Sequence, residues 1–163
     1  GSGKMEVWLP QEASAVKPSK PATLTTTAKI TGSLTERSFS PINDGLVPVV
    51  LNDNSIPYYH WWPKLGTTEW LSYEFSEPRT ISLSTVYWYD DNPWGDCRVP
   101  DSWKLYYKDD AGNWQPVVNP SGYGTKQLVP NEVKFLPVTT RAIKLEVVQP
   151  KEKSSGLYEW SVE

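Results

Sequence analysis

Short runs in which apolar and polar residues alternate recur through this chain, and they constrain its fold more than any other feature. Residues 70–75 read WLSYEF, and the same period of two returns at 83–88, 103–107, 133–135, 143–147 and 158–162. This period places successive side chains on opposite faces of a β-strand. No run has the sustained 3.6-residue stripe of an amphipathic helix, and 15 prolines interrupt the rest. We therefore predict an all-β protein, an antiparallel jelly-roll β-sandwich.

The alternation also predicts which side chains face the interior of this sandwich. The turn sequence DDAGN at residues 109–113 separates two of the runs and predicts a β-hairpin. The residues expected to face inward are Leu71, Tyr73, Val86, Trp88, Trp103, Leu105, Phe135, Ile143, Leu145 and Val147.

The N-terminal part of the chain differs in composition from the rest. Residues 10–27, PQEASAVKPSKPATLTTT, are rich in proline and small polar residues, which is typical of a linker or extended arm. Residues 5–9, MEVWL, read as a short strand before it. We assign residues 1–20 to a strand remnant and linker, and residues 21–163 to one domain, because this length suffices for one hydrophobic core.

The composition excludes several classes of function. The net charge is −3 without any basic block, which argues against a nucleic-acid partner. No apolar run approaches the roughly 20 residues that span a bilayer, so we expect no membrane insertion. Nine Trp and nine Tyr accompany only three Phe. Because Trp and Tyr carry a polar group, this excess fits a recognition surface as well as a packed core.

Five short motifs follow one another in the order found in discoidin, or coagulation-factor type C, domains. They are NDG at 43–45, EWLSYEF at 69–75, TVYW at 85–88, SWKLYY at 102–107 followed by GNW, and GLYEW at 156–160. The chain resembles that family, whose fold is a jelly roll with galactose-binding-domain-like topology. HWWPKLGTTEW at 60–70 and WGDCRVPDSWKLYYKD at 94–109 also look like C-terminal modules of secreted bacterial glycoside hydrolases of the β-L-arabinofuranosidase kind. The first loop, at 46–59, is longer than usual for the family.

The resemblance implies a non-catalytic carbohydrate-binding accessory module of a secreted or periplasmic bacterial glycoside hydrolase. Such a module binds a plant or host polysaccharide and holds the catalytic domain of the same chain near its substrate. The alternative is a structural accessory domain that packs on the catalytic domain and has no sugar site of its own. Adhesion to protein or lipid lacks support, because we identify neither exposed apolar spikes nor a basic surface in the sequence.

Intrinsic catalysis is not expected from these residues. Asp90, Asp91 and Asp96 crowd one loop, but adjacent residues of an extended chain point to opposite sides, which suits a glycosidase pair poorly. His60 is the sole histidine and Cys97 the sole cysteine, so a triad or a transition-metal site is equally unsupported. We expect Cys97 to be a small buried thiol.

A calcium site is implied by the resemblance, since discoidin modules often join their first loop to the last strand with Ca²⁺. Hard oxygen ligands are available in both segments. Asp-Gly and Asn-Asp-Asn are also common turn formers, so ordinary turn chemistry is the alternative. The candidate ligands are Asp44, Asn52, Asp53, Ser55 and Glu159.

A sugar site is expected where loops present aromatic planes beside charged hydrogen-bond partners. In the implied topology, the loop at 90–98 lies near the loop at 58–62, and a turn at 122–124 completes the rim. One of the two adjacent tryptophans there is expected to fill the core, and the strand tryptophans at 70, 88, 103, 114 and 160 to be structural. The candidate sugar-binding residues are His60, Trp61, Trp62, Asp90, Asp91, Trp94, Arg98 and Tyr123.

Overall fold

The computed structural model describes residues 23–51, 53 and 55–163. The predicted strand remnant and linker at 1–20 lie outside the described residues, as does the start of the predicted domain. Two short helical turns precede most of the strands, and their bounds are α1 (Leu24–Thr27) and the 3-10 helix η1 (Ser40–Asn43). The strands are β1 (Lys29–Gly32), β2 (Tyr59–His60), β3 (Thr68–Tyr89), β4 (Ser102–Lys108), β5 (Trp114–Pro116), β6 (Asn131–Val148) and β7 (Gly156–Val162).

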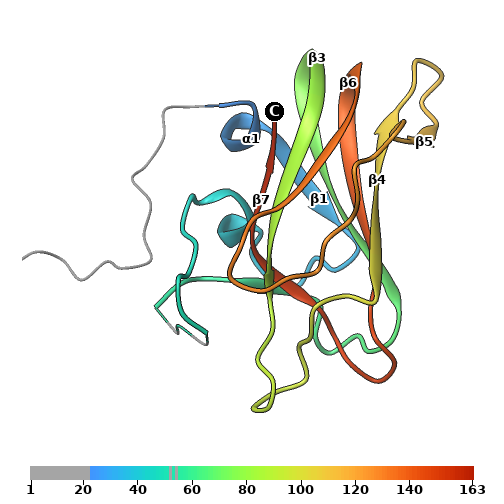
Figure 1. The fold of residues 1–163 in the computed structure, drawn as a ribbon. Helices are drawn as coiled ribbons and strands as arrows, with labels where there is room; N and C mark the ends of the chain where they lie inside the picture. Colours follow the sequence, from blue (N-terminus) through green and yellow to red (C-terminus); the bar gives the residue numbers. More distant parts are fainter. Residues whose placement is uncertain (1–22, 52, 54) are drawn as a thin grey trace, which may run out of the picture.

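Two long strands, β3 and β6, run through both layers of the molecule (Figure 1). The hydrogen-bonded order is β2-β7-β3-β6-β4-β5, and β1 adds to the first part of β3. β7 pairs with the second part of β3, so the two ends of that strand belong to different layers. Register shifts between Glu74 and Arg79 and between Ile81 and Leu83 mark the bend. All pairings between these strands are antiparallel, which confirms the predicted antiparallel β-sandwich.

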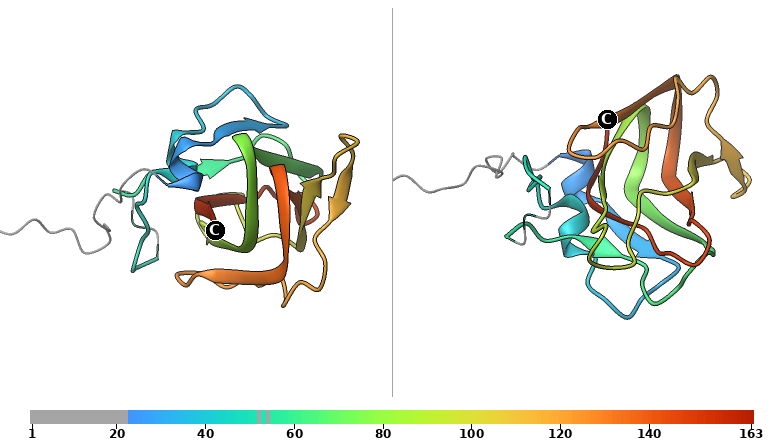
Figure 2. Two further views of the ribbon diagram at one scale, coloured as in Figure 1. Left: turned by 90° about the horizontal axis from the view of Figure 1, so that it is seen from above. Right: turned by 60° about the horizontal axis from the view of Figure 1, so that its bottom comes forward.

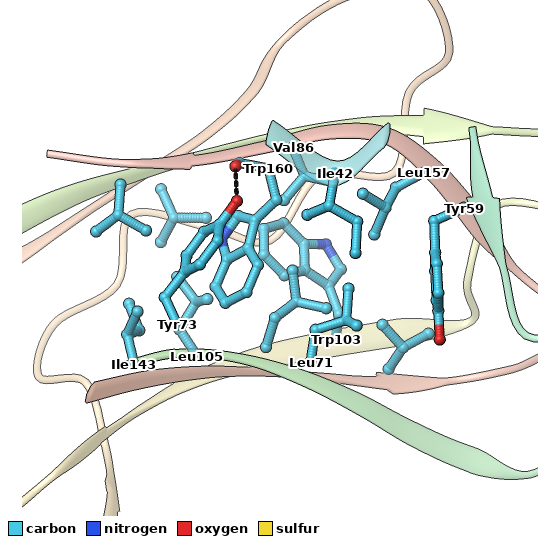
Figure 3. Packing of buried hydrophobic residues seen from close by; sticks show 14 of the residues in the cluster. Ile42, Tyr59, Leu71, Tyr73, Val86, Trp103, Leu105, Ile143, Leu157 and Trp160 are labelled. Carbon is cyan, nitrogen blue, oxygen red and sulfur yellow. Dashed lines mark hydrogen bonds between the residues drawn. The ribbon is translucent and has the colours of Figure 1, made fainter. Parts of the chain in front are cut away.

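The core fills the space between the layers with aromatic rings (Figure 3). All ten residues that the alternation placed inward are buried. Tyr73 stacks on Trp160 at 4.1 Å between ring centroids, and its hydroxyl donates to the Trp160 carbonyl. Trp88 and Trp103 both donate their indole N–H to the carbonyl of Gly124, at 3.0 and 2.9 Å. Trp88 and Trp103 therefore satisfy their polar groups, as burial requires, whereas the buried indole N–H of Trp61 has no hydrogen-bond partner among the described residues.

Some elements differ from the predicted pattern. The runs at 70–75 and 83–88 belong to one strand of 22 residues rather than to two strands. The helical turn α1 was not predicted, and a capping box between Thr23 and Thr26 forms its N-terminus. Of the five strand tryptophans expected to be structural, Trp70 and Trp114 are partly exposed and the other three are buried. Within the described part of the chain, no helix has the length and apolar character needed to cross a membrane.

Candidate functional site

The loop that joins β3 to β4, residues 90–98, is fastened to the segment before β7. Ser154 accepts a hydrogen bond from the backbone N–H of Arg98 at 2.8 Å and donates its own N–H to the carbonyl of Asp96 at 2.9 Å. β2 pairs with the beginning of β7 on the same segment. Figure 2 (right) brings forward the end of the sandwich where this loop, coloured yellow-green, lies. The fold thus brings together two loops that are about 30 residues apart in sequence.

A shallow, open hollow of about 270 Å³ lies between these two segments. This volume is near the lower end of small-molecule sites. Tyr58 forms part of its wall and stacks on Tyr89 at 3.8 Å between ring centroids, which holds the phenol ring in place. The residues that line the hollow are Tyr58, His60, Trp62, Asp91, Gly95, Asp96 and Cys97.

Three of the predicted sugar-binding residues line this hollow, and a fourth is adjacent to it in the chain. His60, Trp62 and Asp91 lie in its wall. Trp94 precedes the lining residue Gly95 and leaves 82% of its surface exposed, while Trp62 leaves 48% exposed. Exposed indoles are costly in water and suited to stacking on an apolar ligand face. The structure therefore places His60 and Trp62 in the wall of one hollow, with Trp94 next to it in the chain.

Two predicted residues lie elsewhere. Trp61 is fully buried and packs edge-on against Tyr59, so it belongs to the core and presents no face to a ligand. Tyr123 is half-buried against Trp103, and its hydroxyl accepts the backbone N–H of Leu105. The turn that carries Tyr123 does not reach the hollow, because its ring is used to cover a core tryptophan.

Two more predicted residues support the loop from within. Asp90 is buried, and its carboxylate accepts two backbone N–H groups of the loop and its end, at 2.9 and 3.0 Å. Arg98 donates one guanidinium nitrogen to the carbonyls of Gly95 and Cys97 and to the Asp91 carboxylate. Both side chains satisfy backbone groups that a loop of this shape leaves without partners. Asp90 and Arg98 therefore hold the loop in position, and these hydrogen-bonding atoms do not face a ligand.

His60 has an unusual protonation behaviour. Burial lowers the pKa of its imidazole from the usual 6.5 to about 4, the nearby Arg37 adds to this, and Asp91 opposes it. The folded pKa lies below the unfolded value, so the stability that neutral His60 contributes is present above pH 6.5. That contribution is lost as the pH falls from about 6.5 to about 4.

We expect His60 to remain neutral at every pH at which a glycan titration is performed near neutrality. The imidazole Cε1 proton, followed by NMR, will titrate with a midpoint near 4, and ligand affinity will not change between about pH 7 and 5.5. A midpoint near 6.5 would contradict the burial of this ring.

No nucleophile or acid–base pair emerges at the hollow from the residues that the structure describes. Burial raises the pKa of the Cys97 thiol to about 12, with Asp91 adding to the effect, so the thiolate is unavailable near neutral pH. Asp91 is ion-paired with Arg98 at 3.3 Å.

The predicted calcium ligands divide into two pairs. Both carboxylate oxygens of Glu159 accept the backbone N–H of Gly45, at 3.0 and 3.1 Å, and Asp44 lies within hydrogen-bond reach of Glu159. Asp53 instead accepts the N–H and hydroxyl of Ser55, at 3.0 and 2.6 Å, which is turn chemistry. Asn52 lies outside the described residues. Among the described residues, no group of three or more His, Cys, Asp and Glu side chains could hold a metal ion.

Asp44 and Glu159 nevertheless fit one part of a calcium site. Burial raises the pKa of the Asp44 carboxyl, while hydrogen bonds to Leu46 and Glu159 act against this rise. Two ionised carboxylates this close repel each other, so the pair is stable only when it shares a proton or a cation. Ca²⁺ would take both carboxylates together with loop carbonyl oxygens.

Sequence reasoning left some exposed or lining residues out of the candidate set. Tyr58 and Asp96 line the hollow, and Lys153 pairs with Asp96 at 3.1 Å. Tyr58 and Asp96 lie within the two loops that the sequence analysis assigned to the sugar site, so their position in the chain could have added them to the candidates. Lys153 lies outside both loops, and nothing in the sequence pointed to it. The structure also exposes an apolar run at residues 49–51, each more than half exposed, where no apolar spike was expected.

Comparison with known proteins bears on both the family and the fold. The sequence model of the F5/8 type C domain matches residues 43–160. A chain from the Streptococcus pneumoniae β-galactosidase BgaA has a similar structure, with a TM-score of 0.71 and 16% sequence identity over 93% of this chain and 98% of that one.

Two further solved structures are carbohydrate-binding modules. CpGH89CBM32-5 from Clostridium perfringens, in complex with GalNAc-β-1,3-galactose, gives a TM-score of 0.59 at 12% identity over 83% of this chain and 94% of that one. Chitosan-binding module 2 of the chitosanase/glucanase from Paenibacillus sp. IK-5, in complex with chitotriose, gives 0.56 at 15% identity over 86% and 98%. At these identities the likeness shows a shared fold and nothing further.

Proposed function

The chain belongs to the F5/8 type C domain family, and from that premise we propose that it is a carbohydrate-binding module. Its ligand site is the hollow between β2 and the loop at 90–98. The observation that carries this proposal is the position of two exposed aromatic side chains, Tyr58 and Trp62, in the wall of one depression with carboxylate acceptors. The highly exposed Trp94 directly precedes Gly95, another residue of that wall. Sugars need such a combination, because a pyranose has apolar C–H faces and hydroxyls at its edge.

The preformed loop supports the same proposal. The Asp90 carboxylate accepts hydrogen bonds from the backbone of the loop at 90–98, and Arg98 donates to its carbonyls, so the shape of the loop is fixed by its own side chains. A site that is ordered in advance loses less conformational entropy when it binds. Trp94, the most exposed aromatic side chain of this loop, is therefore presented on a rigid support.

The parent protein in this proposal is a secreted or periplasmic bacterial glycoside hydrolase of the β-L-arabinofuranosidase kind. The module would keep the catalytic domain of the same chain close to a plant or host polysaccharide through a raised effective concentration. The similarity of fold to modules of carbohydrate-active enzymes supports this assignment. In it the module itself performs no catalysis.

A glycan array probed with the isolated chain tests the proposal. We expect binding to at least one class of plant or host glycan, and competition by the matching free oligosaccharide. Absence of binding across the array, confirmed by titration with millimolar sugars, would remove the proposed function.

The second candidate function is a structural accessory domain that docks on a catalytic domain. It is favoured by one observation: the exposed apolar run at residues 49–51. Exposed apolar surface of this kind also marks protein interfaces. If the array is negative and the chain binds its catalytic domain tightly in trans, this second function replaces the first.

We also propose that Ca²⁺ joins the first loop to β7 through Asp44 and Glu159. Because binding to the native state stabilises it by mass action, chelation will lower Tm and added Ca²⁺ will restore it. Asp44→Asn will abolish this response, whereas Asp53→Asn will leave it intact, since Asp53 bonds to Ser55 instead. An unchanged melting curve in a sample that elemental analysis shows to be metal-free would refute the site.

A further inference from the structure

We infer that the hollow selects uncharged glycans and rejects glycans that carry a carboxylate at the ring that enters it. This inference rests on the proposed function, since it specifies the class of ligand for that same site. It follows from the charges and the hydrogen-bonding groups of the wall.

The two charged residues among the described residues that line the hollow are both carboxylates, Asp91 and Asp96. Their cationic partners, Arg98 and Lys153, are not part of the lining. An anion that enters the hollow therefore approaches two negative charges first. The two cations are already engaged, since each is ion-paired with one of these carboxylates, at 3.3 and 3.1 Å.

Arg98 is poorly placed to act as an anion-binding fork, because its Nη1 is bound to the loop. Its Nη1 donates to the carbonyls of Gly95 and Cys97 at 2.7 and 2.8 Å, in addition to Asp91. A guanidinium that recognises a carboxylate normally offers two parallel N–H donors. Here one of its terminal nitrogens serves the backbone, and the side chain is only 21% exposed.

The lining is richer in acceptors than in charged donors, which suits hydroxyl groups. An ionised carboxylate can only accept, so it needs O–H or N–H donors from the ligand. Asp91 uses Oδ1 for the Cys97 N–H, and Gly95 lies so close to Oδ2 that a Cβ there would be 2.2 Å away. Asp96 is the more accessible acceptor, with 49% of its side chain exposed. Sugar hydroxyls supply donors to it, whereas a uronate supplies another acceptor with like charge.

The test compares sugars that differ in one group. Methyl β-galactopyranoside and methyl β-glucopyranoside are titrated against the protein by NMR beside their C6-oxidised uronates, at low and at high salt. At low salt, the uronates will bind about three- to tenfold more weakly, as expected for like charges a few ångströms apart at a partly solvated site. The difference will shrink at high salt because the repulsion is screened.

The charge variants identify the source of the discrimination. Asp96→Asn will narrow the difference in affinity between each neutral sugar and its uronate. The fold will be retained, because the Asp96 side chain is half-exposed. The control is Asp110→Asn, which makes the same change of net charge in the exposed β4–β5 turn. This variant will leave the difference in affinity between neutral sugars and uronates unchanged. Uronates that bind as tightly as the neutral sugars would overturn this inference and leave the glycan site standing. Failure of all four sugars to bind, together with a negative glycan array, would overturn the glycan site and the inference together.

Discussion

Trp103→Ala will lower the free energy of unfolding by about 3–5 kcal/mol, the cost typical of removing a buried tryptophan. The side chain is 2% exposed and meets Trp88 and Tyr123 edge-on, at 5.2 and 4.9 Å between ring centroids. Its indole N–H also shares the Gly124 carbonyl with Trp88. For a chain of this length, the expected fall in Tm is roughly 6–20 °C.

Trp94→Ala is the matched control for stability. This indole is 82% exposed, so its removal will change the free energy of unfolding by no more than about 0.5 kcal/mol. Urea or thermal unfolding followed by circular dichroism measures both variants. A Trp103→Ala variant as stable as the wild type would show that β4 does not pack as described.

The same Trp94→Ala variant will weaken glycan binding about tenfold or more, which corresponds to roughly 1.4 kcal/mol of lost stacking. Trp62→Ala will act in the same direction, since Trp62 lines the hollow. Isothermal titration with the best glycan from the array measures both. Unchanged affinity in both variants, with the fold intact, would exclude an aromatic platform at this hollow.

Arg98→Ala separates a supporting role from a binding role. Sequence alone suggested that this guanidinium contacts the sugar, but its donors are directed to the loop backbone. We therefore expect the variant to lose stability as well as affinity, while Trp94→Ala loses affinity alone. The structure thus replaces the predicted role of Arg98 as a sugar contact with a role in supporting the loop.

The strands were predictable because their signal is local. A period of two in Leu71 and Tyr73, or in Ile143 and Leu145, places side chains on one face whatever the rest of the chain does. The continuity of β3 was not predictable, since its bend lies at register shifts next to Glu74 and Ile81. Bulges of this kind depend on the partner strand, which no local pattern specifies.

The two adjacent tryptophans show where sequence reasoning about the site ends. Trp61 and Trp62 are the same residue type, and the sequence predicted that one would be core and the other exposed without identifying which. The backbone N–H of Trp61 donates to the carbonyl of Ser155, which is distant in sequence, and its ring is fully buried. The roles of Asp90 and Arg98 depend on distances within a folded loop in the same way.

The most direct test of the glycan site is a titration of the ¹⁵N-labelled chain with its best glycan, followed by two-dimensional NMR. The account predicts that the amide shifts that change will cluster at Tyr58, His60, Trp62, Gly95 and Asp96, together with the indole N–H signals of Trp62 and Trp94. The signals of Trp70 and Trp114, half-exposed on the outer side of the sheet, will stay in place. Changes confined to that outer side, or none at saturating glycan, would contradict the assignment of this hollow as the binding site.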